Sequence, residues 1–212
     1  MEVRMLTVGP VQENCYLVRR DGASEAVIVD PGEEAPRLLA ALDEMGARLA
    51  AILLTHTHFD HIGAVAPVAA ATGAEVWVPE GERRVLADIM SYVPFPGFGP
   101  FESYEAEHTV SGGERLELAG LEIDVLPTPG HSPGHVTFSI PDEDAVFSGD
   151  VLFQGSVGRV DLPGGDWPTL LDSIRLLIDS LPEGTTVYPG HMGVTTLGAE
   201  RASNPFLAEL AR

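Results

Sequence analysis

The segment from Thr55 to His61, with the sequence THTHFDH, places three imidazoles and one carboxylate close together in the chain. The whole 212-residue sequence contains only seven histidines, so nearly half of them lie here. Neutral imidazole and carboxylate together bind zinc, iron or manganese. Four donors this close would crowd one another without a shared cation. We therefore interpret the segment as part of a metal site rather than as an acidic surface loop.

Three further potential ligands follow apolar runs elsewhere in the chain, and a glycine directly precedes each of them: His131, Asp150 and His191. The glycine lets the backbone turn tightly as it leaves a strand. A single histidine or aspartate in such a place is usually a loop residue. The same arrangement at four strand ends makes coincidence improbable, so we predict that these residues join the THTHFDH segment in one site.

The elements that must position these donors are short strands and amphipathic helices. The apolar run from Leu49 to Thr55 predicts a buried strand, and the ligands begin where it ends, as sites often do in layered α/β folds. Helices are predicted over 34–45, 63–72, 167–181 and 204–210. Strands, a helix and further strands in each half indicate two packed sheets with helices outside. We predict one domain over residues 1–212.

The motif His56-Thr57-His58-Phe59-Asp60-His61 matches the HxHxDH signature of the metallo-β-lactamase superfamily, and the chain resembles that family from Asp30 to His191. The resemblance implies an α/β fold, a four-layer αββα sandwich of two mixed sheets with outer helices. It also implies two divalent metal ions per chain, zinc first, with iron or manganese as alternatives. The ligands implied for the first ion are His56, His58 and His131, those for the second are Asp60, His61 and His191, and Asp150 bridges both.

Asp30, His135 and Cys15 are expected to support the structure rather than to bind metal. Asp30 precedes Pro31-Gly32 and would orient the ligand segment, or would only form the turn. His135 lies four residues after His131, and we favour a packing or supporting role for it over ligation. Cys15 lies in an apolar stretch, which predicts a buried, inert thiol.

Further phrases narrow the resemblance to the glyoxalase II-like branch, also called hydroxyacylglutathione hydrolase-like, in its short form. They are residues 148–153 (SGDVLF), 155–161 (GSVGRVD) and 164–166 (GGD), with Glu200 and Asn204-Pro205-Phe206. Members of this branch hydrolyse thioesters such as hydroxyacylglutathione. The implied reaction is attack on the thioester carbonyl by a hydroxide that bridges the two metals, with Asp60 as the catalytic carboxylate beside the nucleophile, and departure of a thiolate.

The substrate pocket is expected to depart from that of the full-length enzymes in this branch. Those enzymes carry an added helical region that helps to grip glutathione, whereas only residues 192–212 follow His191 here. A glutathione pocket would therefore be reduced or built from other residues. Arg159 is a candidate anchor for a substrate carboxylate. Its alternative role is a structural pair with Asp161 or Asp166.

Other reactions of the same fold stay open. A persulfide dioxygenase shares the Gly-Arg-x-Asp and Gly-Gly-Asp phrases and uses one iron, held by the counterparts of His56, His131 and Asp150. Two ions per chain favour hydrolysis, whereas one ferrous ion and oxygen uptake favour oxidation. A lactonase is a further hydrolytic alternative. The aromatic, Pro/Gly-rich segment 91–108 is expected to lack regular structure and to form a substrate wall or lid, a self-packed loop or an oligomer contact.

Composition constrains the partners of the protein. The chain has 32 acidic and 12 basic residues, all of them arginines, and a formal net charge of −20. This charge opposes binding to nucleic acid or to anionic membranes, so a small-molecule substrate is expected. A single cysteine excludes an intrachain disulfide and fits a reducing compartment. With neither a signal peptide nor a membrane span recognisable, we predict a cytoplasmic enzyme of undetermined oligomeric state.

Overall fold

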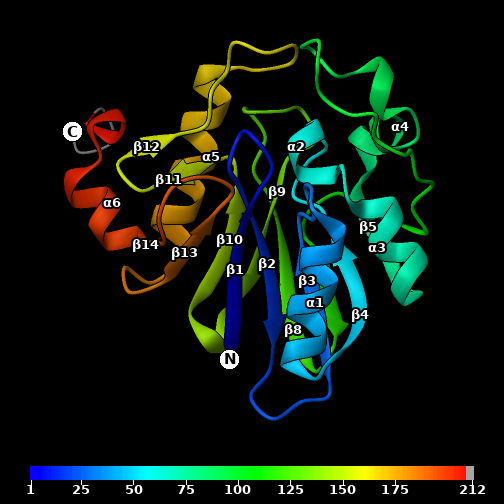
Figure 1. Cartoon of the computed structure of the whole chain (residues 1–212). Coiled ribbons are helices and arrows are strands. Elements are labelled where there is room, and N and C mark those ends of the chain that lie inside the picture. The colour runs from blue at the N-terminus through cyan, green and yellow to red at the C-terminus, as the bar shows by residue number, and fades with distance from the viewer. Residues whose placement is uncertain (209–212) are drawn as a thin grey trace. The chain divides into compact units, whose positions relative to one another are not determined.

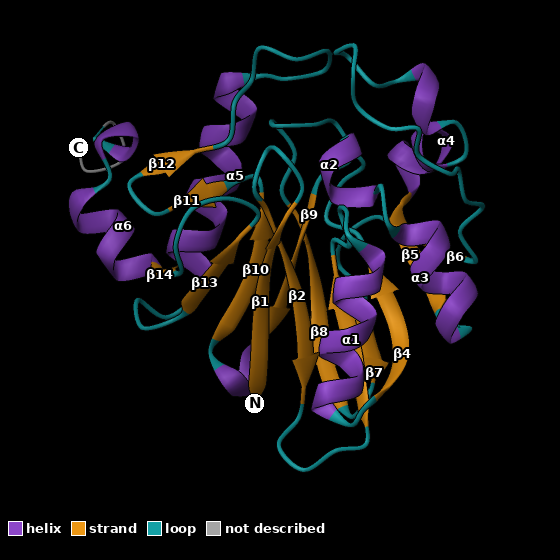
Figure 2. Cartoon of the chain, in the orientation of Figure 1, coloured by secondary structure: helices purple, strands orange, loops and turns teal. Residues whose placement is uncertain are grey.

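The computed structural model describes residues 1–208 and shows a chain of the α/β class that divides into two compact units (Figure 1). The first unit comprises Met1–Val110 and Leu116–Leu121, and the second comprises Ser111–Arg115 and Glu122–Arg212. The structure contains two six-stranded sheets, one formed by strands β1 to β6 and the other by strands of the later part of the chain. Helices border the strands of each sheet (Figure 2).

The first sheet has its strands in chain order from β1 to β6. These strands are β1 (Glu2–Val8), β2 (Glu13–Arg19), β3 (Glu25–Val29), β4 (Arg48–Leu53), β5 (Glu75–Pro79) and β6 (His108–Val110). The pairs β1–β2 and β2–β3 are antiparallel, and the pairs β3–β4, β4–β5 and β5–β6 are parallel. Val29 pairs with Leu53 at the carboxyl ends of β3 and β4. Residues that follow these two strands are therefore neighbours at one sheet edge.

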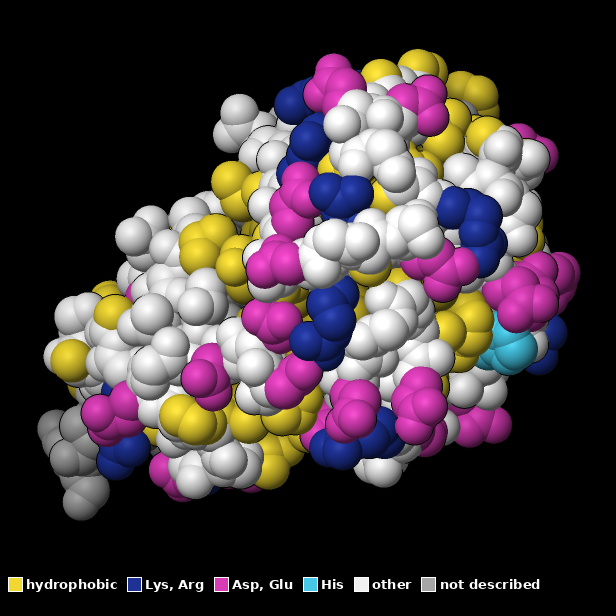
Figure 3. Space-filling view, turned by 90° about the horizontal axis from the view of Figure 1, so that it is seen from below, with side chains coloured by type: hydrophobic (Ala, Val, Ile, Leu, Met, Phe, Trp, Pro, Cys, Tyr) yellow, Lys and Arg dark blue, Asp and Glu magenta, His cyan; other side chains and the backbone are white. Residues whose placement is uncertain are grey.

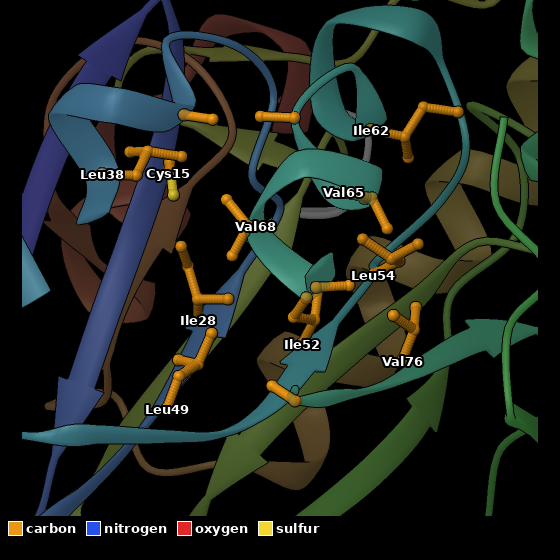
Figure 4. Close-up of a cluster of buried hydrophobic side chains, with 14 of the residues drawn as sticks. Cys15, Ile28, Leu38, Leu49, Ile52, Leu54, Ile62, Val65, Val68 and Val76 are labelled. Atoms are coloured by element: carbon orange, nitrogen blue, oxygen red, sulfur yellow. The ribbon is translucent and has the colours of Figure 1, made fainter. Parts of the chain in front are cut away.

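Helices α1 (Ala35–Met45) and α3 (Val65–Thr72) cover one face of the first sheet. They lie in the crossover connections that the parallel pairs β3–β4 and β4–β5 need. The other helical segments of this unit are α2 (Phe59–Ile62) and α4 (Arg83–Leu86), with the 3-10 turns η1 (Glu80–Glu82) and η2 (Ile89–Ser91). Figure 4 shows the buried side chains of α1 and α3 facing those of the strands: Leu38, Val65 and Val68 against Ile28, Ile52 and Val76. Burial of each such side chain contributes about 1.5–3 kcal/mol.

The second sheet has the order β14-β13-β10-β9-β8-β7. Its strands are β7 (Arg115–Leu118), β8 (Leu121–Pro127), β9 (Val136–Ile140), β10 (Ala145–Gly149), β13 (Thr186–Pro189) and β14 (Thr195–Thr196). Strands β10 and β13 are parallel, and β8, β9 and β10 are antiparallel neighbours. A separate hairpin of β11 (Leu152–Phe153) and β12 (Ser156–Val157) follows β10 directly.

Helices α5 (Trp167–Ser180) and α6 (Leu197–Ser203) pack on the second sheet. Leu170, Ile174 and Leu177 lie on one side of α5, as their spacing predicts, and share a buried cluster with Val146 of β10 and Val187 of β13. Short 3-10 turns follow β9 (η3, Pro141–Glu143) and α6 (η4, Pro205–Leu207). The predicted α/β class, with two mixed sheets and flanking helices, is confirmed.

The structure differs from the sequence-based expectation in several short elements. Strand β4 ends at Leu53 rather than at Thr55, because the Thr55 N–H is donated to a carboxylate instead of to a neighbouring strand. Strands β6, β11, β12 and β14 were missed because each contains only two or three residues, too few for a periodic pattern to show. No helix or strand occurs from residue 92 to residue 107, as expected.

The helix predicted over 204–210 lies partly outside the described residues, since residues 209–212 are not described. Its described part is the 3-10 turn η4, whose first N–H group is capped by the side chain of Asn204. The α-helix of this region, α6, ends before that residue. Pro205 explains the break, because the residue before a proline is driven out of the helical conformation.

The exposed surface reflects the acidic composition. On the face shown in Figure 3, arginine side chains lie among acidic ones. Arg115, for example, pairs with both Glu122 and Asp124 at distances of 3.1 and 2.5 Å. Within residues 1–208, none of the helices has the length and apolarity needed to cross a bilayer.

Candidate metal centre

His56 lies three residues beyond Leu53, the last residue of β4, in the first unit and is fully buried. Its neighbour Thr55 donates its N–H to Asp30 Oδ1 (2.7 Å) and its O–H to Asp30 Oδ2 (2.6 Å). A hydroxyl has one hydrogen, so Thr55 Oγ1 must act as the acceptor in its 3.0 Å contact with Nδ1 of His56. The proton of His56 is thereby placed on Nδ1, and the Nε2 lone pair is directed away from this contact, as a metal ligand requires.

His58 places a second potential donor nitrogen beside Nε2 of His56. Its Nδ1 lies 3.1 Å from His56 Nε2, with the two rings edge to face. Two nitrogens that are each about 2.0–2.1 Å from a tetrahedral zinc ion would be about 3.3 Å apart. The separation of the two donors in this structure therefore fits a shared ion.

Asp60 and His61 form another donor pair, in the short helix α2. His61 is buried, and its Nδ1 donates to Asp30 Oδ2 at 3.0 Å, which leaves Nε2 as the coordinating nitrogen. That Nε2 lies 3.8 Å from Asp60 Oδ2. The backbone approach is close at this point, since a Cβ at Gly32 would lie 1.8 Å from the carbonyl oxygen of Asp60. This explains the glycine of the Asp30-Pro31-Gly32 sequence.

Asp30 also offers an oxygen close to ligand atoms of His56 and His61, within 4.8 Å, and could in principle be a ligand itself. Its two carboxylate oxygens, however, already accept three hydrogen bonds from Thr55 and His61. These bonds tie Asp30 to the ligand segment, as the orienting role expected from the sequence requires. That role stays a prediction.

The second unit presents its donors at three separate strand ends. His131 follows β8, Asp150 follows β10 and His191 follows β13. Asp150 Oδ2 lies 3.4 Å from His131 Nε2 and 3.6 Å from His191 Nε2. One carboxylate oxygen thus lies near two imidazole nitrogens, at separations close to those of donors to a common ion.

Main-chain groups orient the ligands of the second unit. His131 Nδ1 donates to the carbonyl oxygen of Arg159 at 2.7 Å, so its Nε2 is the coordinating nitrogen. The N–H of Asp150 donates to His135 Nε2 at 3.1 Å, and His135 Nδ1 then donates to Thr128 Oγ1 at the same distance. His135 is thus the acceptor that supports Asp150. A Cβ at Gly158 would lie 1.9 Å from the Asp150 carbonyl oxygen, so glycine is required there.

The Arg159 side chain pairs with Asp161 through bonds of 2.6 and 2.7 Å, and both side chains are exposed. This hydrogen bonding lowers the pKa of Asp161 to about 2 and raises the pKa of Arg159. The pair with Asp161, which the sequence left open as an alternative, is therefore present. Asp161 occupies the Nε and one Nη2 donor, so a substrate carboxylate would bind the remaining donors of the guanidinium or displace Asp161.

Part of the aromatic segment 91–108 packs against the ligand-bearing helix α2. Phe98 and Phe101 lie 4.7 and 5.9 Å from the ring of Phe59, measured between ring centroids. Tyr92 and Phe95 are instead 46% and 43% exposed. The segment therefore has an inner aromatic edge beside the ligands of the first unit and an exposed outer edge.

Two contacts of the site were missed by sequence reasoning. One is the carbonyl oxygen of Arg159, since a main-chain atom leaves no trace in residue type. The other is Glu82, which accepts the N–H and O–H of Thr57 at 2.7 and 2.9 Å. In the sequence Pro79-Glu80-Gly81-Glu82, neither glutamate differs from an ordinary surface residue, so no sequence signal distinguished Glu82.

The fold and these donors define the class of the protein. The family model of the metallo-β-lactamase superfamily matches residues 8–191, and the chain belongs to this superfamily, whose members use divalent metals. It is a metallo-hydrolase of that superfamily. The "Probable metallo-hydrolase YqgX" of Bacillus subtilis is 41% identical over 98% of both chains. The "Hydroxyacylglutathione hydrolase GloC" of Haemophilus influenzae is 37% identical, again over 98% of both.

Solved structures support the same fold. The B3 metallo-β-lactamase BLEG-1 is 41% identical and superimposes with a TM-score of 0.92, covering 98% of this chain and all of its own. TTHA1623 in a di-iron-bound form is 42% identical with a TM-score of 0.82, covering 97% and 100%. ETHE1 from Myxococcus xanthus is 28% identical with a TM-score of 0.78, covering 97% and 84%.

Proposed function

We propose that this protein hydrolyses a thioester such as hydroxyacylglutathione and does so with two divalent metal ions. The observation that carries the proposal is the donor arrangement of the second unit, where Asp150 Oδ2 lies near the Nε2 atoms of both His131 and His191. A carboxylate that binds two ions would hold them close together, as two-metal hydrolysis requires. The similarity to GloC over nearly the whole chain supports a hydroxyacyl thioester as substrate.

In this proposal the two units form one domain and contribute donors to one centre. The ligands of the first ion are His56, His58 and His131, the ligands of the second are Asp60, His61 and His191, and Asp150 is common to both. We expect zinc, with iron or manganese as alternatives, because imidazole and carboxylate serve all three metals. The di-iron form of TTHA1623 makes iron a specific alternative to test.

The bound ions would supply a hydroxide at neutral pH and polarise the thioester carbonyl. Within the chain, the Asp60 side chain, 14% exposed at the start of α2, would orient the attacking water and hold its proton. His56, His61 and His131 donate their Nδ1 protons to Thr55 Oγ1, Asp30 Oδ2 and the Arg159 carbonyl oxygen, so the site needs no rearrangement of tautomers. The hydroxide would add to the carbonyl carbon and the carbon–sulfur bond would break, which gives the carboxylic acid of the acyl group and a thiolate.

Arg159 is the proposed anchor for a substrate carboxylate. Its guanidinium is exposed and is bound only to an exposed partner, Asp161, so exchange of one carboxylate for another requires no buried charge to be uncovered. The inner edge of the segment 91–108, with Phe98 and Phe101 beside α2, would form an apolar wall near Asp60.

The test is a substrate comparison on metal-loaded protein. Lactoylglutathione, a lactone and glutathione persulfide are offered in parallel, with release of thiol and uptake of oxygen both recorded. We expect thiol release from lactoylglutathione in protein that carries two ions per chain. Oxygen uptake with the persulfide in protein that carries one iron, without thioester hydrolysis, would instead establish the dioxygenase reaction.

Hydrolysis of a β-lactam is a second candidate, favoured by the TM-score of 0.92 with BLEG-1. The same nucleophile would attack an amide carbonyl in a strained ring. A chromogenic cephalosporin added to the comparison separates the two hydrolytic reactions. We expect a kcat/KM for the thioester that exceeds the value for the cephalosporin, and the reverse order would favour the lactamase reaction.

A further inference from the structure

Glu82 is a buried carboxylate with an unusual position relative to the ligands. It is the last residue of η1, it is only 5% exposed, and it lies 25 residues from Thr57 in sequence. Its Oε2 accepts both the N–H and the O–H of Thr57, at 2.7 and 2.9 Å. Thr57 is itself buried and stands between His56 and His58. Burial of a carboxylate costs free energy unless it is well hydrogen-bonded, and the two bonds from Thr57 offset that cost. The position of Glu82 therefore calls for a functional reason.

The same contact occurs one residue before His56. Asp30 accepts the N–H and the O–H of Thr55, as Glu82 accepts those of Thr57. Both threonines that flank His56 are thus bound to buried carboxylates through main-chain and side-chain donors. With the backbone held on both sides of His56, the side chains of His56 and His58 retain the alternation that directs them to a common point.

We propose that Glu82 is a positioning residue that holds Thr57, and through it the donor pair of His56 and His58, in the coordinating geometry before a metal binds. The inference rests on the proposed metal site and extends it to a residue without a ligand atom. Outer partners of metal ligands typically change metal affinity by about 10–100-fold when they are removed. We expect an effect of this size from Glu82.

The two hydrogen bonds to a single oxygen make the choice of variants specific. The amide oxygen of glutamine can accept both bonds, so Glu82→Gln should keep the geometry, whereas Glu82→Leu removes the acceptor. Thr57→Val removes only the O–H donor and retains the N–H, and it should have a smaller effect. Glu107 provides a control at an exposed position, because it too accepts one N–H and one O–H, from Val76 and Tyr104.

The experiment measures the affinity of metal-free full-length protein for Zn²⁺ by competition with a chromogenic chelator, and records the visible absorption spectrum after loading with Co²⁺. We expect Glu82→Leu to weaken Zn²⁺ binding by about 10–100-fold and to alter the Co²⁺ spectrum. Glu82→Gln and Glu107→Leu should stay within about threefold of the wild type, which is a difference of less than 1 kcal/mol.

Two results would overturn the proposal. One is wild-type Zn²⁺ affinity and an unchanged Co²⁺ spectrum in Glu82→Leu, even if its melting temperature falls, because this would assign Glu82 a purely structural role. The other is equal loss in Glu82→Gln and Glu82→Leu. If Glu82→Leu does not fold, Thr57→Val decides the question: loss of one of the two bonds should weaken Zn²⁺ binding by about three- to tenfold. Affinity within about twofold of the wild type in that variant would contradict the proposal. Absence of thioester hydrolysis with normal Zn²⁺ binding would refute only the proposed substrate.

Discussion

The two units of the chain hold their metal donors in different ways. In the first unit four donors lie on one segment, from His56 to His61, and buried carboxylates far away in sequence fix that segment. In the second unit each donor lies at its own strand end, and the supports are a main-chain carbonyl and an imidazole. In the first unit, two carboxylates, Asp30 and Glu82, orient several donors at once. In the second unit, each supported donor has its own supporting group.

This difference has consequences for mutation. Asp30 contacts Thr55 and His61 directly and reaches His56 through Thr55, so its loss would disturb donors of both proposed ions. In the second unit, His135 bonds one proposed ligand, Asp150, through its N–H, and has only an edge contact with the ring of His131. The size of a mutational effect should therefore depend on which unit supplies the supporting group.

The largest effect is expected from Asp150→Ala. This change removes the one carboxylate proposed to bind both ions, so we expect loss of both metals and hydrolysis below detection. Elemental analysis of the purified variant, together with thiol release from lactoylglutathione, measures the two effects. Retention of two ions with appreciable activity would show that Asp150 is not shared.

Asp30→Asn should have the next largest effect. Both oxygens of Asp30 accept hydrogen bonds, and the amide nitrogen of asparagine would face a donor on one side. We expect a loss of about 1–3 kcal/mol in the free energy of unfolding, together with a fall of about 10–100-fold in Zn²⁺ affinity. Denaturant unfolding and chelator competition measure these quantities.

The comparison of Asp30→Asn with Glu82→Gln is informative. The glutamine amide can satisfy both donors of Thr57 through its one oxygen, whereas an asparagine in place of Asp30 cannot satisfy all the donors that the carboxylate accepts. Similar behaviour of the two variants would contradict the hydrogen-bond assignment.

His135→Leu should act more locally. The N–H of Asp150 would lose its acceptor within the protein, which we expect to cost about 1–3 kcal/mol of unfolding free energy. Zn²⁺ affinity should fall less than in Asp30→Asn because His135 accepts only the main-chain N–H of Asp150 and does not bond its carboxylate. His135→Gln, whose amide oxygen can accept the same N–H, serves as the control. A larger loss of metal in His135→Leu than in Asp30→Asn would reverse the proposed contrast between the units.

The smallest effects are expected at the exposed pair of Arg159 and Asp161. Arg159→Ala should raise KM for an anionic thioester and Asp161→Asn should lower it, each by less than about tenfold and with kcat little changed. Steady-state kinetics at several salt concentrations test this, because an exposed charge interaction weakens with salt. An unchanged KM in both variants would exclude Arg159 as the substrate anchor.

The pH dependence of this pair has a definite sign. The Arg159 hydrogen bond lowers the pKa of Asp161 in the folded protein to about 2, below its ordinary value of 3.8. A group with a lowered folded pKa stabilises the protein above its unfolded pKa and loses that contribution as the pH falls through the folded value. Thermal unfolding of wild type and Asp161→Asn should therefore differ by the same amount from pH 5 to pH 8, and converge only below about pH 4.

The contrast between the units also explains what the sequence could predict. The HxHxDH motif is visible because its donors are consecutive and local, and the second-unit donors could be found because each follows a strand and a glycine. Glu82 and the Arg159 carbonyl could not be found, because their roles arise from contacts between residues that are 25 and 28 positions apart. Strand β4 ended two residues early for the same reason, since the distant Asp30 takes the Thr55 N–H.

The most direct measurement is the metal content of freshly purified protein and of protein reconstituted with excess Zn²⁺. Elemental analysis against protein concentration gives the number of ions per chain. With seven donors in the proposed arrangement and Asp150 common to both positions, we predict two ions per chain in the reconstituted wild type. One ion per chain at saturation, whatever its identity, would contradict the two-metal site.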